Sequence, residues 1–348
     1  MTKKLILFDG SSLLSTSFFG NVPKEYYSLK NDENREEALK KMKIMRTSTG
    51  LYTNAVYTMS KILLKVFAEQ KPSHVAVAWD ISRDTFRRDM YPEYKGQRDE
   101  TKPELKSQFA LMQRVLQAMG ITQFMVNKYE ADDILGTLVN KFETEIPVFI
   151  MTKDQDSLQL VSDYTRVWLI TSKAKEMYDS INPLFKHEKN SGSPENTFEF
   201  TPLYVKEFYG ISPEQIVDMK ALEGDSSDNI PGVKGVGEKA VIPLLQEYGT
   251  VENLYSEIEN LTPVEEKQLK EFWKNSLGIS RSPIAYLLKK GENGEKSAKE
   301  SALLSKKLAT IVRDIPEFQN VKLDDLVFSL NEVGMKEIFR ELEFKSLL

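Results

Sequence analysis

The stretch Glu130-Ala131-Asp132-Asp133 places three carboxylates within four residues. In a partly buried site such a group repels itself by on the order of several kcal/mol, so it requires either full hydration or cations. Apolar residues follow at helical spacing, at positions 134, 135, 138 and 139, which predicts an amphipathic helix whose dipole offsets part of the repulsion. Two interpretations are open at this point. The group is a solvated acidic cap of a common kind, or it is part of a site for a hard metal ion.

Further aspartates stand directly after predicted strands. The short apolar runs at residues 5–8, 75–79 and 148–151 are typical of buried parallel strands. Asp9, Asp80 and Asp154 follow them, and Asp156 comes two positions after Asp154. One aspartate after a strand is ordinary turn chemistry. Ligands of open α/β sheets, however, bind beyond the carboxyl ends of the strands, so three aspartates on one edge with an acidic helix start favour the metal site.

The composition limits the chemistry that such a site can perform. The chain of 348 residues has no cysteine and only two histidines, His74 and His187, which excludes thiolate chemistry and argues against histidine-based sites. Oxygen ligands point to Mg²⁺ or Mn²⁺. The net charge of −5 does not by itself indicate nucleic acid. No apolar run approaches membrane length, and Asp9 ends the first run too early for a signal peptide, so we expect a cytoplasmic protein without membrane contact.

The order of predicted elements indicates the fold class. In residues 1–200, strands alternate with helices predicted at 11–19, 53–67 and 109–119, and further strands are predicted at 121–126 and 167–170. This alternation predicts an α/β fold with a mostly parallel sheet flanked by helices. Residues 21–48 are polar and charged, typical of an insertion or a mobile helical segment, and residues 171–200 predict a linker or loop. Beyond residue 200 the pattern is helical, with helices predicted at 202–209, 212–222, 238–248, 303–312 and 335–344.

Residues 82–114 combine basic side chains with aromatic rings. The basic residues are Arg83, Arg87, Arg88, Lys95, Arg98, Lys102 and Lys106, and the aromatic residues among them are Phe86, Tyr91 and Tyr94. A solvated face has such a composition. So does a surface for single-stranded nucleic acid, which needs cations for phosphates and flat rings for bases. This stretch alone leaves both interpretations open.

A glycine-rich turn lies between two predicted helices in the second half. Gly232, Gly235 and Gly237 alternate with Lys234 and precede Lys239. Glycines let backbone N–H groups approach an anion, and the helix that starts at residue 238 points its positive end the same way. A tight helix–helix turn explains one glycine, whereas three glycines with two lysines predict a clamp for a phosphate backbone that reads no base sequence. Upstream, Asp225 and Asp228 are three apart and can face one ligand.

Taken together, these stretches resemble the 5′ nuclease domain of bacterial DNA polymerase I and, more widely, the flap endonuclease family. The motifs are Phe8-Asp9-Gly10, Trp79-Asp80, residues 91–98 (Tyr-Pro-Glu-Tyr-Lys-Gly-Gln-Arg), residues 129–133, Asp154-Gln155-Asp156, residues 224–239 and residues 340–348. The resemblance covers most of the chain. It implies a structure-specific 5′ nuclease that hydrolyses DNA at 5′ ends, flaps, nicks or gaps by a two-metal-ion mechanism. Because residues 340–348 resemble the point at which the polymerase would continue, we expect a free-standing nuclease, and we expect a monomer.

The same resemblance implies a domain organisation. Residues 1–200 would form a PIN-like, metal-dependent nuclease domain with a helical arch near residues 82–114. Residues 201–290 would form a helix–three-turn–helix region that binds duplex DNA. Residues 291–348 would be C-terminal helices that pack back on the nuclease.

The resemblance also implies roles for particular residues. The first metal ion would be held by Asp9, Asp80, Glu130 and Asp132, and the second would be held or oriented by Asp133, Asp154, Asp156, Asp225 and Asp228, some through water. Lys95 and Arg98, three apart on a helix, would contact the reacting phosphate, and Tyr94 would stack on a base. The turn with Gly232, Lys234, Gly235, Gly237 and Lys239 would hold the duplex and a K⁺ ion. Without nine site carboxylates, the net charge of −5 becomes +4 for the rest of the chain, which suits DNA.

Some positions depart from the family pattern and keep other functions open. Lys153 stands where the family usually has glycine, and Thr16 stands where it usually has arginine. Residues 21–48 and 171–200 are longer than usual. One alternative is a branched-DNA-binding protein with weak or lost cleavage, which the lysine near the second metal site would favour. Another is a ribonuclease of the related PIN-like group, which lacks the glycine-rich clamp.

Overall fold

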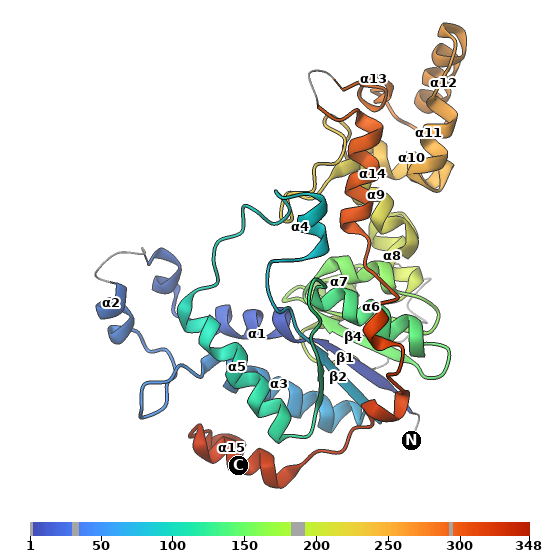
Figure 1. Cartoon of the computed structure of the whole chain (residues 1–348). Coiled ribbons are helices and arrows are strands. Elements are labelled where there is room, and N and C mark those ends of the chain that lie inside the picture. Colours follow the sequence, from blue (N-terminus) through green and yellow to red (C-terminus); the bar gives the residue numbers. More distant parts are fainter. Residues whose placement is uncertain (1–2, 30–34, 182–191, 292–294) are drawn as a thin grey trace.

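The computed structural model describes residues 3–29, 35–181, 192–291 and 295–348. An α/β body carries a helical region that extends away from it on one side (Figure 1). Between the two, α4 Phe86–Met90 and the loop that follows it cross from the helical region to α5 Pro103–Ala118. No described helix is both long enough and apolar enough to span a membrane.

One sheet of six strands forms the centre of the body, in the order β3-β2-β1-β4-β5-β6. The strands are β1 Leu5–Asp9, β2 His74–Ala78, β3 Thr122–Phe124, β4 Val148–Thr152, β5 Thr165–Ile170 and β6 Thr197–Phe200. The pairs among β1 to β5 are parallel, and β6 runs antiparallel to β5. The predicted α/β fold with a mostly parallel sheet is therefore confirmed.

Alternate side chains of β1 pack into two hydrophobic cores, one on each face of the sheet. Ile6 and Phe8 pack into the core formed with α1 Gly10–Phe19, α3 Asn54–Gln70, α5 Pro103–Ala118 and α15 Glu332–Glu341. Leu5 and Leu7 face the opposite core, which includes α6 Ala131–Phe142 and continues into the helical region. Both faces of the sheet are thus covered, which explains why the strands are continuous apolar runs without alternation.

Residues 171–200 contain more structure than the sequence predicted. Their described part forms α7 Ala174–Ser180 and the edge strand β6. Phe198 and Phe200 of β6 are fully buried, and the Trp168 indole N–H donates to the carboxylate of Glu199 at 2.8 Å. A strand of four residues between polar segments gives little periodic signal, so its pairing with β5 was invisible in the sequence.

The helical region comprises α8 Pro202–Tyr209, α9 Ile216–Glu223, α10 Glu238–Tyr248, α11 Val251–Ile258, α12 Pro263–Asn275, α13 Ile284–Leu287 and α14 Ala298–Ala309. Residues 291–348 were expected to pack back on the nuclease, and the part that follows α14 does so. The N–H groups of Val312 and Ile315 donate to side chains of α6, and Val327 forms a bridge with His74 at the start of β2. Helix α14 packs against α9 and α11, where Lys306 pairs with the buried Asp218 at 2.7 Å. Helix α15 alone of these two helices returns to the body and packs on α5.

Candidate metal and nucleic acid site

The strand-end aspartates meet at the carboxyl edge of the sheet. The Asp9 carboxylate caps α1 by accepting from the Ser12 N–H at 2.9 Å, and its other oxygen accepts from the Thr152 hydroxyl at 2.9 Å. Asp80, after β2, accepts from the Ala131 N–H at 2.8 Å. These contacts tie the ends of β1, β2 and β4 to one another and to the first turn of α6, so the sequence-predicted convergence occurs.

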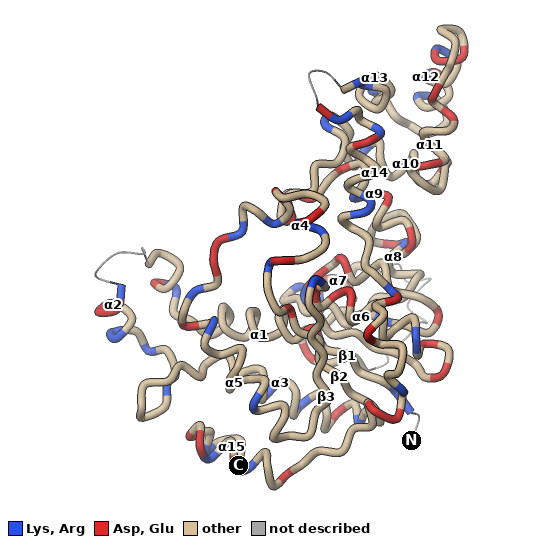
Figure 2. The backbone as a smooth tube through the Cα atoms, in the orientation of Figure 1, with Lys and Arg blue, Asp and Glu red and all other residues tan. Residues whose placement is uncertain are grey.

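A cavity of about 580 Å³ opens along this edge. Five of the predicted metal ligands line it, namely Asp9, Asp80, Glu130, Asp132 and Asp154. Lys95 and Arg98 line it as well, together with small hydroxyl side chains of α1. We call this space the carboxylate cavity. In Figure 2 acidic and basic residues alternate along α4 and the loop after it, beside the ends of the central strands.

The electrostatics of the cavity favour a bound cation. Burial, followed by the charge of Asp80, raises the pKa of Asp9 from 3.8 to about 7. Burial, followed by Asp154, holds the pKa of Asp132 well above its usual value. Carboxylates whose pKa is raised in this way lose their protons reluctantly unless a cation offsets their mutual repulsion. All donors are hard oxygen atoms, so the set fits a hard divalent ion.

Part of this donor set already has cationic partners. Lys95 Nζ lies 3.0 Å from Glu130 Oε1 and 3.6 Å from Asp228 Oδ2, and Arg98 also pairs with Asp228. Consistent with these pairs, the described residues contain no group of three acidic or histidine side chains arranged as a ready-made metal cage. A divalent ion would therefore compete with internal cations for some of its ligands.

Lys95 and Arg98 do not lie on a helix, contrary to the prediction. They belong to the turns between α4 Phe86–Met90 and α5, and Lys95 has a left-handed backbone with φ of 52°. Its N–H donates to the Asp228 carbonyl at 2.9 Å, which fixes the turn against the helical region. The turn thereby aims both cations into the carboxylate cavity.

Tyr94 is also placed differently from the prediction. Only 3% of the residue is exposed, and its hydroxyl lies 3.1 Å from Glu130 Oε2 and 3.2 Å from Asp228 Oδ2. A buried ring in this position cannot stack on a base. Tyr94 instead contacts two carboxylates from distant parts of the chain, Glu130 at the start of α6 and Asp228 in the turn after α9.

Asp133 is not available as a metal ligand. It is completely buried, and its two oxygens accept from Arg87 Nη1 and Nη2 at 2.7 Å each. The same oxygens accept from the N–H groups of Glu130 at 3.0 Å and Val312 at 2.9 Å. Four donors from the protein occupy the two oxygens, which argues against Asp133 as a direct ligand of the second ion, whereas the orienting role stays a prediction.

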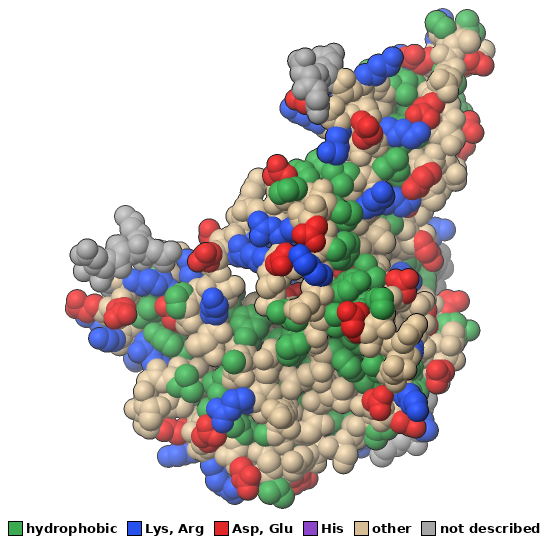
Figure 3. All heavy atoms as spheres, viewed as in Figure 1, with side chains coloured by type: hydrophobic (Ala, Val, Ile, Leu, Met, Phe, Trp, Pro, Cys, Tyr) green, Lys and Arg blue, Asp and Glu red, His purple; other side chains and the backbone are tan. Residues whose placement is uncertain are grey.

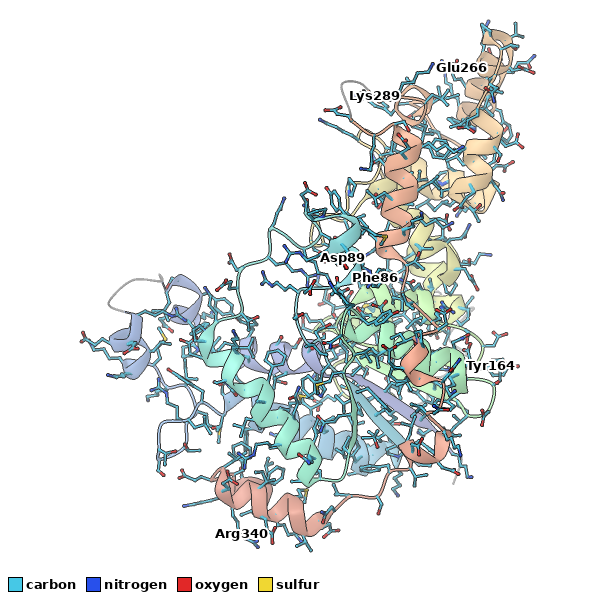
Figure 4. All side chains as sticks on the ribbon, viewed as in Figure 1. Phe86, Asp89, Tyr164, Glu266, Lys289 and Arg340 are labelled. Carbon is cyan, nitrogen blue, oxygen red and sulfur yellow. The ribbon has the colours of Figure 1, made fainter. Side chains whose placement is uncertain are left out.

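Arg87 is the residue that sequence reasoning misjudged at this point. It was counted among the cations of residues 82–114, but it is buried and also donates to the carbonyls of Leu308 and Thr310. Figure 4 labels two other residues of α4, Phe86 and Asp89. The sequence neighbours of Arg87 are mostly polar and charged, so the local sequence gave no signal that this residue is buried.

A second cluster adjoins the carboxylate cavity. Lys220 of α9 pairs with Asp156 and, at 2.7 Å, with Asp225. Burial and then Asp154 raise the pKa of Asp156 to about 6. Burial alone would raise the pKa of Asp225, but Lys220 and Ser227 outweigh it and lower that pKa to about 2. Two predicted ligands of the second ion are thus joined by an ammonium group that the sequence analysis did not single out.

Thr16 and Lys153, the two residues that depart from the family pattern, both lie at the site. Thr16 lines the carboxylate cavity, and Lys153 lines both this cavity and an adjoining one of about 360 Å³ that includes Lys220. Lys153 is exposed, and its N–H donates to the Ser12 hydroxyl at 3.2 Å. The residue that replaces the family glycine thus stands between the two clusters of carboxylates.

The glycine-rich turn divides into a buried and an exposed part. Gly232 is buried, with its N–H donating to the Ser305 hydroxyl at 2.9 Å and its carbonyl accepting from Ser301 at 2.7 Å. A Cβ on Gly232 would lie 2.3 Å from the N atom of Gly224. The prediction that Gly232 contacts DNA is wrong, because both of its backbone groups bind α14 and its role is close packing.

The exposed part retains the predicted features of a phosphate clamp. Lys234, Gly237 and Lys239 are exposed, and a Cβ on Gly237 would meet no atom within 4 Å. Gly235 is exposed too, and a Cβ added to it would lie 2.5 Å from the ring of Tyr286. Gly237 precedes the first turn of α10 without a side-chain cap, so N–H groups at this helix start have no side-chain acceptor. Lys289, after α13, is also exposed in the helical region (Figure 4).

Comparison with known proteins identifies the family of this chain. Residues 4–187 match the family described as 5′-3′ exonuclease, N-terminal resolvase-like domain, and residues 211–333 match 5′-3′ exonuclease, C-terminal SAM fold. The chain belongs to the 5′-3′ exonuclease family. Members of this family hydrolyse phosphodiester bonds, so the prediction of a nuclease is confirmed.

Similar proteins agree with the family. DNA polymerase I of Bacillus caldotenax is 36% identical over 350 residues, and that of Bacillus subtilis (strain 168) is 36% identical over 348 residues. These alignments cover 100% and 99% of this 5′-3′ exonuclease chain but 32% of each polymerase, so the chain spans about a third of the length of these relatives.

Solved structures show the same fold. The crystal structure of the T5 D15 protein co-crystallized with metal ions has a TM-score of 0.55 at 18% identity, covering 97% of this chain and 99% of that chain. The catalytic core of Rad2 in complex with DNA substrate has a TM-score of 0.50 at 13% identity, covering 98% and 88%. At these identities the likeness concerns the fold alone.

Proposed function

We propose that this 5′-3′ exonuclease is a structure-specific nuclease for DNA, acting where single strand and duplex meet, at 5′ ends, flaps, nicks or gaps. The observation that carries the proposal is the carboxylate cavity, in which acidic groups from three strand ends and the start of α6 face Lys95 and Arg98. The similar T5 protein was also crystallised as a flap endonuclease in a pseudo-enzyme-product complex with DNA and metal ions, with a TM-score of 0.54. That complex supports DNA and metal ions as the ligands proposed here.

We assign two Mg²⁺ or Mn²⁺ sites to this edge. Asp9, Asp80, Glu130 and Asp132 would hold one ion, and Asp154, Asp156, Asp225 and Asp228 would hold or orient the other. When bound, such a pair of ions activates a water and stabilises the leaving oxygen of a phosphodiester. The protein supplies the placement, since Thr152, Ser12 and the Ala131 N–H fix the Asp9 and Asp80 carboxylates.

Lys95 and Arg98 are the groups proposed to act on the reacting phosphate. In the structure they neutralise Glu130 and Asp228, and 20% of the Lys95 side chain and 45% of the Arg98 side chain are exposed. Divalent ions on those carboxylates would release the two cations toward a phosphate in the cavity. Replacing Lys95 with alanine should therefore lower the single-turnover rate by about 10²- to 10³-fold, the loss typical of one electrostatic contact in a transition state.

The exposed clamp is proposed to hold the duplex. Lys234 and Lys239, with the N–H groups at Gly235 and Gly237, offer contacts to a phosphate backbone without reading bases. A K⁺ ion at this turn, and action as a monomer, belong to the same proposal. Figure 3 shows basic side chains gathered over α4, with acidic ones among them, between this region and the body.

The decisive experiment is cleavage of a labelled 5′-flap duplex. The wild-type protein should cleave at the junction with Mg²⁺ and not with EDTA. Asp80→Ala and Asp132→Ala should abolish cleavage while DNA binding stays measurable, because neither residue belongs to the clamp. Normal rates in either variant would refute the metal assignment.

A second function is favoured by one specific observation. Lys220 occupies the space between Asp156 and Asp225, which would suit a branched-DNA-binding protein with weak or lost cleavage. Tight binding of the flap duplex by the wild-type protein without any Mg²⁺-dependent product would support that alternative and reject the nuclease.

A further inference from the structure

A short helix from a later part of the chain lies against the glycine-rich turn. This helix, α13, packs beside α14 at the outer end of the helical region (Figure 1). A Cβ added to Gly235 would lie between 2.5 and 3.0 Å from three ring atoms of Tyr286 in α13. The ring therefore rests directly on the backbone of the turn. Residues 281–290, which contain α13, form a surface that we call the side wall, next to the proposed duplex clamp.

The side wall is fixed to the hydrophobic core of the helical region. Ile284 and Leu287 are each 1% exposed and belong to the larger core of the molecule. The Leu287 N–H donates to the Pro283 carbonyl at 3.0 Å, and the Lys289 carbonyl accepts from the Ala298 N–H at the start of α14 at 2.9 Å. These contacts hold a helix of one turn that would not form by itself in water. The outer side chains of the side wall are thus attached to a defined backbone.

The outer face of the side wall carries unpaired cations. Arg281, Lys289 and Lys290 are exposed. Among the residues that the structure describes, none of the three forms a salt bridge, whereas Lys270 of α12 and Lys299 of α14 pair with glutamates. Cations without an internal partner can bind an anion without first breaking an ion pair. The side wall therefore offers three positive charges to an external ligand.

The surroundings show that the sign of the surface is mixed. Glu238, directly after the turn, is exposed, and so is Glu295, whose carbonyl oxygen would lie 2.0 Å from a Cβ on Gly291. A large anionic protein surface would meet these carboxylates. A narrow row of phosphates can follow the cations and pass beside the acidic groups. The pattern thus fits a nucleic acid backbone better than a broad acidic partner.

Duplex DNA meets this description. It carries one negative charge per about 1.7 Å of its axis, so a duplex held at Lys234 and Lys239 presents further phosphates beyond the clamp. Tyr286 is 51% exposed and connects the clamp to the side wall. We propose that the side wall binds the phosphate backbone of the duplex and extends the clamp along the DNA, away from the carboxylate cavity. The proposal rests on the proposed function, whose duplex contact it continues.

The salt dependence of duplex binding in EDTA tests the side wall. The triple variant Arg281→Ala, Lys289→Ala, Lys290→Ala removes three contacts, and each phosphate contact contributes about 0.9 to the slope of log affinity against log salt concentration. The slope should fall by about 2.7. Between about 50 and 200 mM salt, the wild type should therefore lose roughly 40-fold more affinity than the alanine variant. The variant Arg281→Lys, Lys289→Arg, Lys290→Arg keeps the charges and should keep the wild-type slope.

A matched control removes the same charge from α12. Lys267, Lys270 and Lys274 are exposed on this helix, and Figure 4 shows Glu266 of α12 well apart from Lys289. The triple alanine variant of these lysines should leave the slope unchanged. Urea unfolding should show the same stability for all variants, because exposed cations contribute little to the folded state.

Hydroxyl-radical footprinting locates the contact on the DNA. The wild-type protein should protect two neighbouring stretches of the duplex backbone. The alanine variant of the side wall should lose protection of the stretch farther from the flap, because α13 lies at the outer end of the helical region (Figure 1). The clamp variant Lys234→Ala, Lys239→Ala should instead lose the stretch nearer the flap.

The outcomes separate the side wall from the nuclease function. The side wall is refuted if its alanine variant has the slope and footprint of the wild type, even when both proteins cleave. It is also refuted if the α12 variant lowers the slope equally, since the effect would then come from total charge. If no protein cleaves with Mg²⁺, the nuclease proposal fails, but the slopes and footprints in EDTA still support or refute the side wall.

Discussion

Replacing Asp133 with asparagine should damage the fold and leave the metal site intact. Asp133 stands beside the proposed metal ligand Asp132 in the sequence, yet the two have different surroundings. Asp133 is fully buried and faces Arg87, whereas Asp132 lines the carboxylate cavity. Asparagine keeps the size of the side chain and removes its charge, so the variant isolates the ion pair.

The magnitude follows from the contacts that would be lost. The Asp133 carboxylate accepts hydrogen bonds from two guanidinium nitrogens and two backbone N–H groups, all at 2.7–3.0 Å. Its neutralisation leaves the Arg87 guanidinium buried with only the weaker Glu130 contact at 3.4 Å and two carbonyls as acceptors. Removing one partner of a buried ion pair costs about 3–5 kcal/mol. Such a loss is a large fraction of a typical free energy of unfolding, about 5–15 kcal/mol.

The assay is urea unfolding in EDTA, combined with Mg²⁺ titration of the folded protein by calorimetry. Asp133→Asn should unfold at much lower urea while its Mg²⁺ affinity stays within about threefold of wild type, since one carboxylate outside the coordination sphere has a small effect. Asp132→Asn is the matched control and should show the reverse, with normal or increased stability and lost Mg²⁺ binding. The reasoning is refuted if Asp133→Asn unfolds within about 1 kcal/mol (about fivefold in the equilibrium constant) of wild type, or if it loses Mg²⁺ as Asp132→Asn does.

Three further predictions test the electrostatics. Without metal, the free energy of unfolding should fall by about 2–3 kcal/mol as the pH rises from about 5 to 8. The folded-state pKa of Asp9, about 7, exceeds the unfolded value of 3.8, so the stabilisation by its proton is complete below the unfolded pKa and is lost through pH 7. In urea unfolding this loss should disappear in saturating Mg²⁺ and in Asp9→Asn, and an unchanged pH dependence of stability in Asp9→Asn would contradict the prediction. Lys153→Gly should reach half-maximal cleavage at about threefold lower Mg²⁺, because it removes a cation beside both clusters; an unchanged titration would mean that the ammonium points to solvent. The double variant Lys234→Ala, Lys239→Ala should reduce the slope of log affinity against log salt concentration for duplex binding by about two, as measured by fluorescence anisotropy. The control variant Lys336→Ala on α15 should leave this slope unchanged. Equal slopes in the wild type and both variants would place the duplex elsewhere.

Local sequence was sufficient for the central strands, for several helices and for the edge on which the site lies. Apolar runs that end in Asp9, Asp80 and Asp154 specify buried parallel strands, and parallel strands bring their carboxyl ends together by geometry alone. Helix periodicity placed α8 and α10 at the residues where they are observed. The resemblance identified the family because its motifs contain the residues that the chemistry requires.

Tertiary structure decided what each polar residue of those motifs does. Asp132 and Asp133 are adjacent in the sequence, but successive positions of a helix point about 100° apart, so one side chain faces the cavity and the other meets Arg87. Gly232 and Gly237 read alike, yet only Gly232 is enclosed by α14. Tyr94 and Lys220 owe their surroundings to segments far away in the chain. Long-range packing sets burial and partners, and a single sequence carries no local signal of them.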